Sequence, residues 1–177
     1  AFVQEIMADH LLAQAFRNKY RILVFPLMNP DGVDMGHWRH NAGGIDLNRD
    51  WAYYHQPETR QVADFIVQTA RQNKSEVILG LDFHSTYHDV YYTNKDQTTA
   101  MPSFKDYWLL GIHQSIGEEI NERPSNIGGP VSKNWFLTQF DAVGITYEIG
   151  DNTPRDFIKR KGQASAEEMM QLLIMRE

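Results

Sequence analysis

The chain has 177 residues, of which 42 % are hydrophobic, and a chain of this length is typical of one domain with its own core. It carries 17 basic and 23 acidic residues, so its formal net charge is −6. Nucleic acids and anionic membranes bind basic surfaces, and no apolar run approaches the roughly 18 residues of a membrane span, so neither is expected as a partner. The absence of cysteine excludes disulfides, zinc–thiolate sites and a thiol nucleophile.

Hydrophobic periodicity predicts helices that alternate with apolar strands, which is typical of a single α/β domain over residues 1–177. The apolar run at residues 20–26 is continuous, so we expect a strand that is covered on both faces. A long loop over residues 27–56 follows it, and loops of this length usually carry function. In chain order, the predicted elements are a helix at 1–18, strand 20–26, helix 57–74, strands 76–83 and 90–93, helices 103–121 and 131–140, strand 144–149, and a helix from 153 to the C-terminus with a break near Gly162.

Polar residues follow or end three of these strands, and ligands of open α/β sheets bind at the carboxyl ends of strands. His84 closes one strand, where a neutral imidazole can either ligate zinc or cap the strand by hydrogen bonds. Glu148 lies between apolar residues of the last strand. Burial raises the pKa of a carboxyl group and suits a general base, although an ion pair with Arg155 is an alternative.

The loop between residues 27 and 56 contains a second candidate group, Arg39, Asn48 and Arg49. A guanidinium fork matches the geometry of a carboxylate, and an adjacent amide adds further hydrogen bonds. These residues therefore indicate an anion or oxyanion site in an acidic protein. Alternatively, the arginines pair with the aspartates of the loop itself, which are Asp31, Asp34, Asp46 and Asp50.

Taken in order, these motifs resemble the M14 metallocarboxypeptidases, the carboxypeptidase A-like zinc peptidases. Each string is common by itself, but the whole set in this order over residues 29–157 is specific. The matching strings are Asn29-Pro30-Asp31-Gly32, Trp38-Arg39, Asp46-Leu47-Asn48-Arg49-Asp50-Trp51, Pro57-Glu58-Thr59, His84-Ser85 and Tyr147-Glu148-Ile149.

The resemblance implies a three-layer αβα fold with a mixed central sheet, and one zinc ion held by an H-x-x-E motif and a later histidine. By position, His84 is that later ligand and Glu148 is the general base. Arg39 would polarise the scissile carbonyl and stabilise the oxyanion, while Asn48 and Arg49 would bind the terminal carboxylate. The implied substrate is a peptide or a small amide with a free carboxylate.

The H-x-x-E motif is absent from residues 1–177, and the chain opens within a helical pattern. We therefore expect the motif and the N-terminal strands of the fold to lie in a segment upstream of this sequence. A catalytic zinc needs three protein ligands, so residues 1–177 alone are expected to bind zinc weakly or not at all and to be inactive. An uncovered sheet edge would also favour self-association, or copurification with an N-terminal piece.

Two further features leave the specificity open. Residues 122–130 contain no tyrosine, although the family's mobile tyrosine should lie a little before Trp135. The base of the specificity pocket is either Val131, which would favour apolar terminal residues, or Lys133, which would favour acidic ones.

Two alternatives to a carboxypeptidase remain open on the sequence. The first is a zinc-dependent N-acyl amino acid deacylase similar to succinylglutamate desuccinylase or aspartoacylase, which share an Asp-Leu-Asn-Arg string with a strand-end His and Glu. The second is a non-catalytic pseudo-enzyme that keeps only the carboxylate-binding residues.

Overall fold

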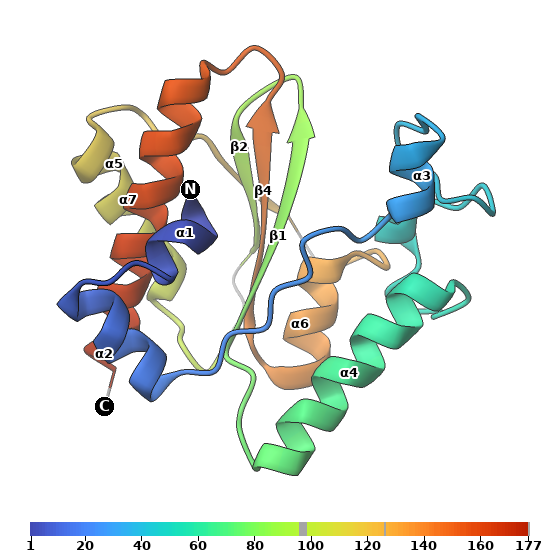
Figure 1. Ribbon diagram of the computed structural model, residues 1–177, viewed down its shortest axis with the longest axis horizontal. Helices are drawn as coiled ribbons and strands as arrows, with labels where there is room; N and C mark the ends of the chain where they lie inside the picture. The colour runs from blue at the N-terminus through green and yellow to red at the C-terminus, as the bar shows by residue number, and fades with distance from the viewer. Residues whose placement is uncertain (96–98, 126, 177) are drawn as a thin grey trace.

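A computed structural model describes residues 1–95, 99–125 and 127–176, and it places a mixed four-stranded sheet between two layers of helices (Figure 1). The strand order is β1-β4-β2-β3, with β1 parallel to β4, β2 antiparallel to β4, and β3 parallel to β2. This confirms the three-layer αβα class. The strands are β1 (Leu79–Thr86), β2 (Val90–Asn94), β3 (Glu122–Ser125) and β4 (Val143–Gly150).

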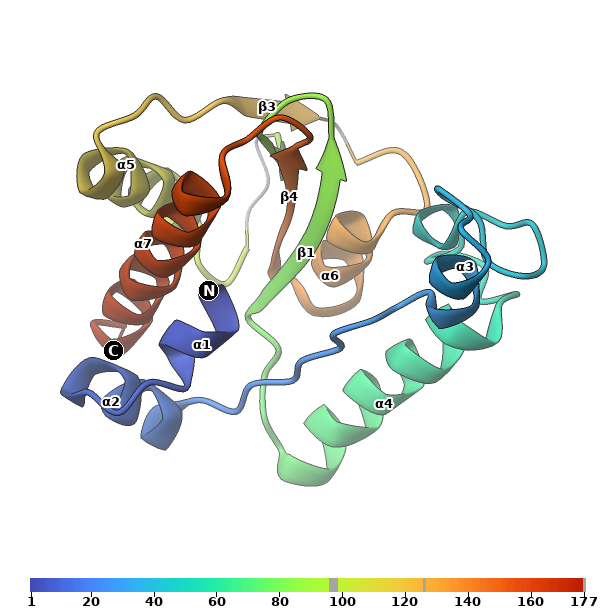
Figure 2. The ribbon, with the colours of Figure 1, turned by 45° about the horizontal axis from the view of Figure 1, so that its top comes forward.

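The helices cover both faces of the sheet, and Figure 2 shows α1, α2, α5 and α7 on one side of β1 and β4, with α4 and α6 on the other. Each face has its own cluster of buried apolar side chains. In the described part of the chain, no helix is long and apolar enough to cross a bilayer. The helices are α1 (Phe2–Ile6), α2 (Leu11–Lys19), α3 (Pro30–Asp34), α4 (Pro57–Asn73), α5 (Phe104–Ile116), α6 (Ser132–Phe140) and α7 (Arg155–Ile174), with a short 3-10 helix η1 (Leu47–Arg49).

The N-terminal segment differs from the prediction. The single helix expected over residues 1–18 is two helices, and His10 caps the second by accepting a hydrogen bond from the backbone N–H of Ala13 at 3.2 Å. The strand predicted at residues 20–26 is wrong, because this run is an extended connection from α2 to α3 (Figure 1). An apolar run forms a strand only with a partner, and Leu23 and Val24 remain 37 % and 48 % exposed.

Elsewhere the prediction erred mainly at element boundaries. The helix expected over residues 103–121 ends at Ile116, because Gly117 has a φ of +72° and closes it in the left-handed region. Residues 122–125 form β3 instead of loop, and residue 126 lies outside the described part. The final helix begins at Arg155 and runs through Gly162 without a break. At Gly162 a Cβ would stand 3.1 Å from the side chain of Ala1, so a small residue lets the N-terminus approach α7.

The strand after α4 begins three residues later than expected and continues to Thr86, so His84 and Ser85 lie inside it. The long loop over residues 27–56 contains α3 and η1. The helices predicted at 57–74 and 131–140 and the strands predicted at 90–93 and 144–149 are confirmed to within one residue at each end.

Two glycines let α6 pack directly on the sheet. A Cβ at Gly80 would stand 2.1 Å from the ring of Phe136, and one at Gly144 would stand 2.0 Å from the carbonyl oxygen of Lys133. Any other residue at either position would push α6 away from β1 and β4. This close packing brings the N-terminus of α6, at Ser132, to the side chains of β1.

The loop that precedes α4 is fixed by one buried carboxylate. Asp50 is 2 % exposed, and it accepts hydrogen bonds from the backbone N–H groups of His55 at 3.1 Å and Gln56 at 2.8 Å, and from the hydroxyl of Thr59. Although burial alone would raise the pKa of Asp50, these bonds hold it below its usual value. Asp50 therefore anchors η1, directly before it, to the start of α4.

Candidate active site at the carboxyl ends of β1 and β4

His84 and Glu148 are neighbours across the parallel pair of β1 and β4, where their Cα atoms are register partners. Register partners on adjacent strands project from the same face of a sheet, so the imidazole and the carboxylate lie side by side. Both positions are in the carboxyl-terminal halves of their strands. This is the edge at which the sequence predicts a ligand site.

Glu148 has a carboxylate oxygen, Oε2, that is buried and has no hydrogen-bond partner within the described residues. Burial raises the pKa of Glu148, while the positive charges of His84 and Arg39 act in the opposite direction. The ion pair with Arg155 that the sequence left open is not formed in the described part of the structure. A buried acceptor without a donor costs free energy, and such groups concentrate at sites that receive a ligand or a proton.

The imidazole of His84 is oriented by its own strand. Its Nε2 lies 2.7 Å from Oδ2 of Asp82, two residues earlier on the same face, and 3.4 Å from Nδ2 of Asn48. The hydroxyl of Ser132, at the start of α6, also donates to Asp82. Burial alone would lower the pKa of His84, but the hydrogen bond and negative charge of Asp82 raise it above its usual value.

Asp82 and Ser132 were not predicted from the sequence. Asp82 could have been found, because a residue two positions before a strand-end histidine projects from the same face. Ser132 carries no such signal, since it is 50 residues away from Asp82 in the chain and arrives only through the packing of α6.

The loop residues approach from η1 and from the turn before it. Asn48 reaches the site through both ends of its amide: Nδ2 faces His84, and Oδ1 accepts a hydrogen bond from the backbone N–H of Ser132 at 2.9 Å. The exposed guanidinium of Arg49 donates to the carbonyl of Asn48 at 2.8 Å. Of the two loop arginines, Arg39 pairs with a loop aspartate, Asp46, at 3.4 Å, which matches the alternative left open by the sequence.

Arg39 nevertheless acts on the site. Its guanidinium lies 5.0 Å from the ring centroid of Trp38, its side chain is 46 % exposed, and its charge lowers the pKa of Glu148. The structure thus brings His84, Glu148 and Asn48 together, with Arg39 in electrostatic range and Arg49 beside Asn48.

The residues present do not form a zinc site by themselves. Across residues 1–95, 99–125 and 127–176, no group of three His, Cys, Asp or Glu side chains is placed to hold a metal ion. His84 offers one imidazole, and its Nε2 already faces Asp82. A catalytic zinc needs three protein ligands, so this chain supplies at most part of such a centre.

We therefore expect residues 1–177 to bind zinc without a defined stoichiometry and more weakly than micromolar. Competition with a chromophoric zinc chelator measures this affinity directly. His84→Ala shows whether any bound zinc uses the site, and His113→Ala, which removes a histidine of α5, is the matched control. Stoichiometric sub-micromolar binding that only His84→Ala abolishes would contradict this prediction.

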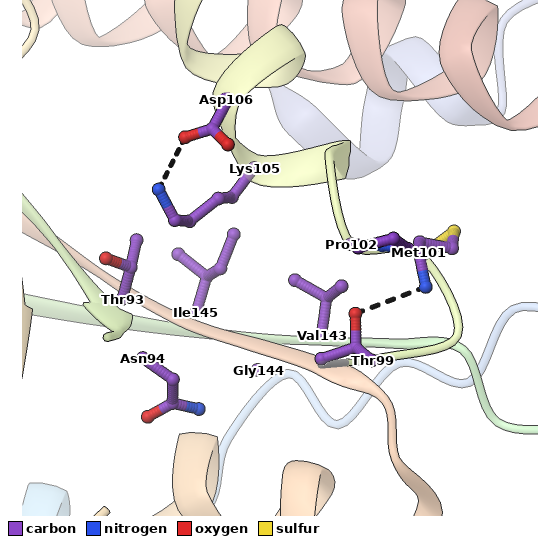
Figure 3. A pocket seen from close by; sticks show the side chains of 10 residues that line it. All are labelled: Thr93, Asn94, Thr99, Met101, Pro102, Lys105, Asp106, Val143, Gly144 and Ile145. Atoms are coloured by element: carbon purple, nitrogen blue, oxygen red, sulfur yellow. Dashed lines mark hydrogen bonds and ion pairs between the residues drawn. The ribbon is translucent and has the colours of Figure 1, made fainter. Parts of the chain in front are cut away.

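A cavity of about 350 Å³ lies elsewhere, between α5 and the sheet. Figure 3 shows Val143 and Ile145 pointing from β4 toward α5, with Lys105 paired to Asp106 beyond them. These β4 residues belong to the first half of the strand, whereas Glu148 is in the second half. The cavity therefore does not include His84 or Glu148, although Asn94, which accepts a hydrogen bond from Lys133, is one of the residues that line it.

The fold matches solved metallocarboxypeptidases. The chain superposes on a metallo-carboxypeptidase from Pseudomonas aeruginosa with a TM-score of 0.72 at 20 % identity, over 97 % of this chain and 51 % of that one. The fold is therefore that of the metallocarboxypeptidases.

The family follows from the sequence match. Residues 1–167 match the Peptidase_M14 model, described as zinc carboxypeptidase, so the chain belongs to this family of metallopeptidases. It is 36 % identical to an uncharacterized protein of Zymomonas mobilis over 151 residues, which are 78 % of this chain and 39 % of that protein. It is 26 % identical to cytosolic carboxypeptidase 6 of Caenorhabditis elegans over 121 residues, 60 % of this chain and 25 % of that one. The chain thus spans less than half of these two relatives.

Proposed function

We propose that this chain carries the substrate-binding and general-base residues of a zinc-dependent carboxypeptidase, which hydrolyses the C-terminal peptide bond of its substrates. The observation that supports this most is the buried, unpartnered Oε2 of Glu148 beside His84. A carboxylate whose pKa is raised by burial is suited to take a proton from an attacking water near neutral pH. In this proposal Glu148 is the base.

The loop side chains have complementary roles in the proposal. Arg39 stabilises the negative charge that develops on the scissile carbonyl oxygen, and one such donor is worth about 3–4 kcal/mol of barrier. Asn48 and Arg49 bind the free carboxylate at the end of the substrate, which restricts cleavage to the last peptide bond. The exposed guanidinium of Arg49 forms no ion pair within the described residues and so has its charge available.

Zinc, when bound, would polarise the carbonyl and activate water. Within this chain His84 is the one residue proposed as a ligand. The other two are proposed to come from an H-x-x-E segment outside residues 1–177, since the described part holds no cluster that could replace it. Activity should therefore be assayed with residues 1–177 as part of a polypeptide that also contains an H-x-x-E segment.

Val131 and Lys133 are the two candidates for the base of the specificity pocket, and the contacts described next favour Lys133. Its side chain is buried, and Nζ donates to the amide oxygens of Asn94 at 2.5 Å and Asn134 at 2.9 Å, with no carboxylate in ion-pair range in the described part. Burial lowers the pKa of Lys133 to about 8. A buried ammonium without a counter-charge is costly, and an acidic substrate side chain would supply one. We therefore propose acidic terminal residues.

A substrate panel tests the proposal. Peptides ending in Glu should be hydrolysed with a higher kcat/KM than the same peptides ending in Leu, and C-terminally amidated peptides should be poor substrates. Lys133→Met should lower kcat/KM for the Glu peptide by about 10- to 100-fold, because a charge-assisted hydrogen bond to substrate contributes about 1.5–3 kcal/mol.

Lys105→Met is the matched control, since it removes an ammonium that pairs with Asp106 and Glu122 away from the site. It should leave the Glu-to-Leu preference unchanged. Hydrolysis of N-acyl amino acids in preference to peptides would instead assign the chain to the deacylase class. Tight binding of peptides without any hydrolysis would assign it to the non-catalytic class.

A further inference from the structure

An ion pair with a buried lysine lies behind β4, on the face opposite Glu148. Lys161 of α7 is 2 % exposed, and its ammonium pairs with Oδ1 of Asp89, in the turn before β2. The other oxygen of that carboxylate, Oδ2, accepts a hydrogen bond of 2.9 Å from the hydroxyl of Tyr147. Lys161, Asp89 and Tyr147 thus link α7, the turn before β2, and β4.

The same ammonium sits against two aromatic rings. Nζ of Lys161 lies 4.7 Å from the ring centroids of both Tyr91 and Tyr147. These tyrosines are register partners on β2 and β4, and their rings stack at 4.3 Å with an interplanar angle of 7°. A charge as buried as this persists only when it is well paired, and here a carboxylate and two aromatic rings lie against it.

This arrangement fixes the side chain of the residue that precedes Glu148. The ring of Tyr147 is held by Tyr91 on one face, by an edge contact with Phe83 at 6.0 Å, and by its hydroxyl bond to Asp89. Successive side chains of a strand point to opposite faces, so the orientation of Tyr147 sets the direction in which Glu148 projects.

The turn that carries Asp89 also lies directly against the end of β4. A Cβ at Gly150 would stand 2.8 Å from the backbone nitrogen of Asp89, so the turn closes onto the strand there. The contact allows little independent movement of the two segments. Neither Lys161 nor Asp89 is needed for the chemistry proposed above, which leaves the placement of β4 as the role for this ion pair.

We propose that Lys161 and Asp89 are positioning residues: through the Tyr147 hydroxyl they hold the end of β4 and aim the Glu148 carboxylate toward His84. This inference rests on the proposed function of Glu148 as base. It adds Lys161, Asp89 and Tyr147 to the residues on which the rate of peptide hydrolysis depends.

Tyr147→Phe tests the link most directly, because it removes one oxygen and leaves the stacked ring in place. Tyr20→Phe is the matched control: it removes a tyrosine hydroxyl that donates to the carbonyl of Leu173 near the end of α7, away from β4. In the full chain without metal, amide hydrogen exchange of residues 147–149 should become about tenfold faster in Tyr147→Phe, relative to the first half of β4, and should not change in Tyr20→Phe.

In the polypeptide that also supplies an H-x-x-E segment, Tyr147→Phe should lower kcat about tenfold with KM unchanged, since a small misplacement of a catalytic group slows chemistry without weakening binding. Lys161→Met should do the same, and Lys161→Arg should restore most of the rate. Equal exchange in the two tyrosine variants, or an unchanged kcat in Tyr147→Phe, would overturn the inference. If the unaltered protein hydrolyses nothing, the proposed function fails, and the exchange comparison alone then decides whether Tyr147 anchors β4.

Discussion

Glu148→Gln is expected to lower kcat for peptide hydrolysis by about 10³-fold, because glutamine has nearly the same shape but cannot accept the proton of the attacking water. The effect should be in kcat and not in KM, since the side chain is proposed to act on the water and not on the ground-state peptide. The measurement is steady-state kinetics on a peptide with a free C-terminal carboxylate, in a polypeptide that also supplies an H-x-x-E segment. Zinc content should be the same in both proteins.

The matched control is Glu119→Gln, which makes the same exchange at an exposed position away from the site. It should leave both kinetic constants unchanged. The buried Oε2 of Glu148 also predicts that Glu148→Gln does not lower the free energy of unfolding, since an unpartnered buried carboxylate costs stability. Retained turnover in Glu148→Gln would remove Glu148 as the base and would leave its raised pKa to be explained by burial alone.

The sequence predicted the class of the fold because the predictable elements carry strong local signals. Pro57 begins α4 and the apolar run of β4 ends near Glu148, and both are recognisable without a partner. The extended run at residues 20–26 has the same apolar signal as β4 but no strand pairs with it in the described part of the sheet. An apolar, β-branched sequence can form a strand, but it does so only where another strand lies beside it and pairs with it.

The proximity of the candidate residues was predictable from the sequence, but most of their individual contacts were not. His84 and Glu148 lie at strand ends, and the carboxyl ends of strands meet at one edge, so their proximity follows from topology. Asn48 was predicted as a carboxylate ligand, but its contacts with His84 and Ser132 depend on how η1 and α6 pack. The Lys161–Asp89 pair had no signal at all, because it joins a helix and a turn that are 72 residues apart.

Arg49→Ala is expected to raise KM by about 10- to 100-fold for peptides with a free terminal carboxylate, since a charge-assisted hydrogen bond contributes about 1.5–3 kcal/mol. For C-terminally amidated versions of the same peptides, KM should stay within about twofold, because an amide offers no charge for the guanidinium. The ratio of the two KM values, and not either alone, measures the contribution of Arg49. The assay uses the same H-x-x-E-containing polypeptide as the Glu148 experiment.

Arg60→Ala provides the control, because it removes an exposed guanidinium from α4 and should change neither KM. Arg49→Lys separates charge from geometry: a lysine keeps the charge but not the planar fork, so it should recover part of the lost affinity and not all of it. Because Arg49 donates to the Asn48 carbonyl, its removal could also loosen η1, and that would weaken free and amidated peptides alike. An equal loss on both substrates would therefore assign Arg49 to holding the loop and leave the carboxylate to Asn48.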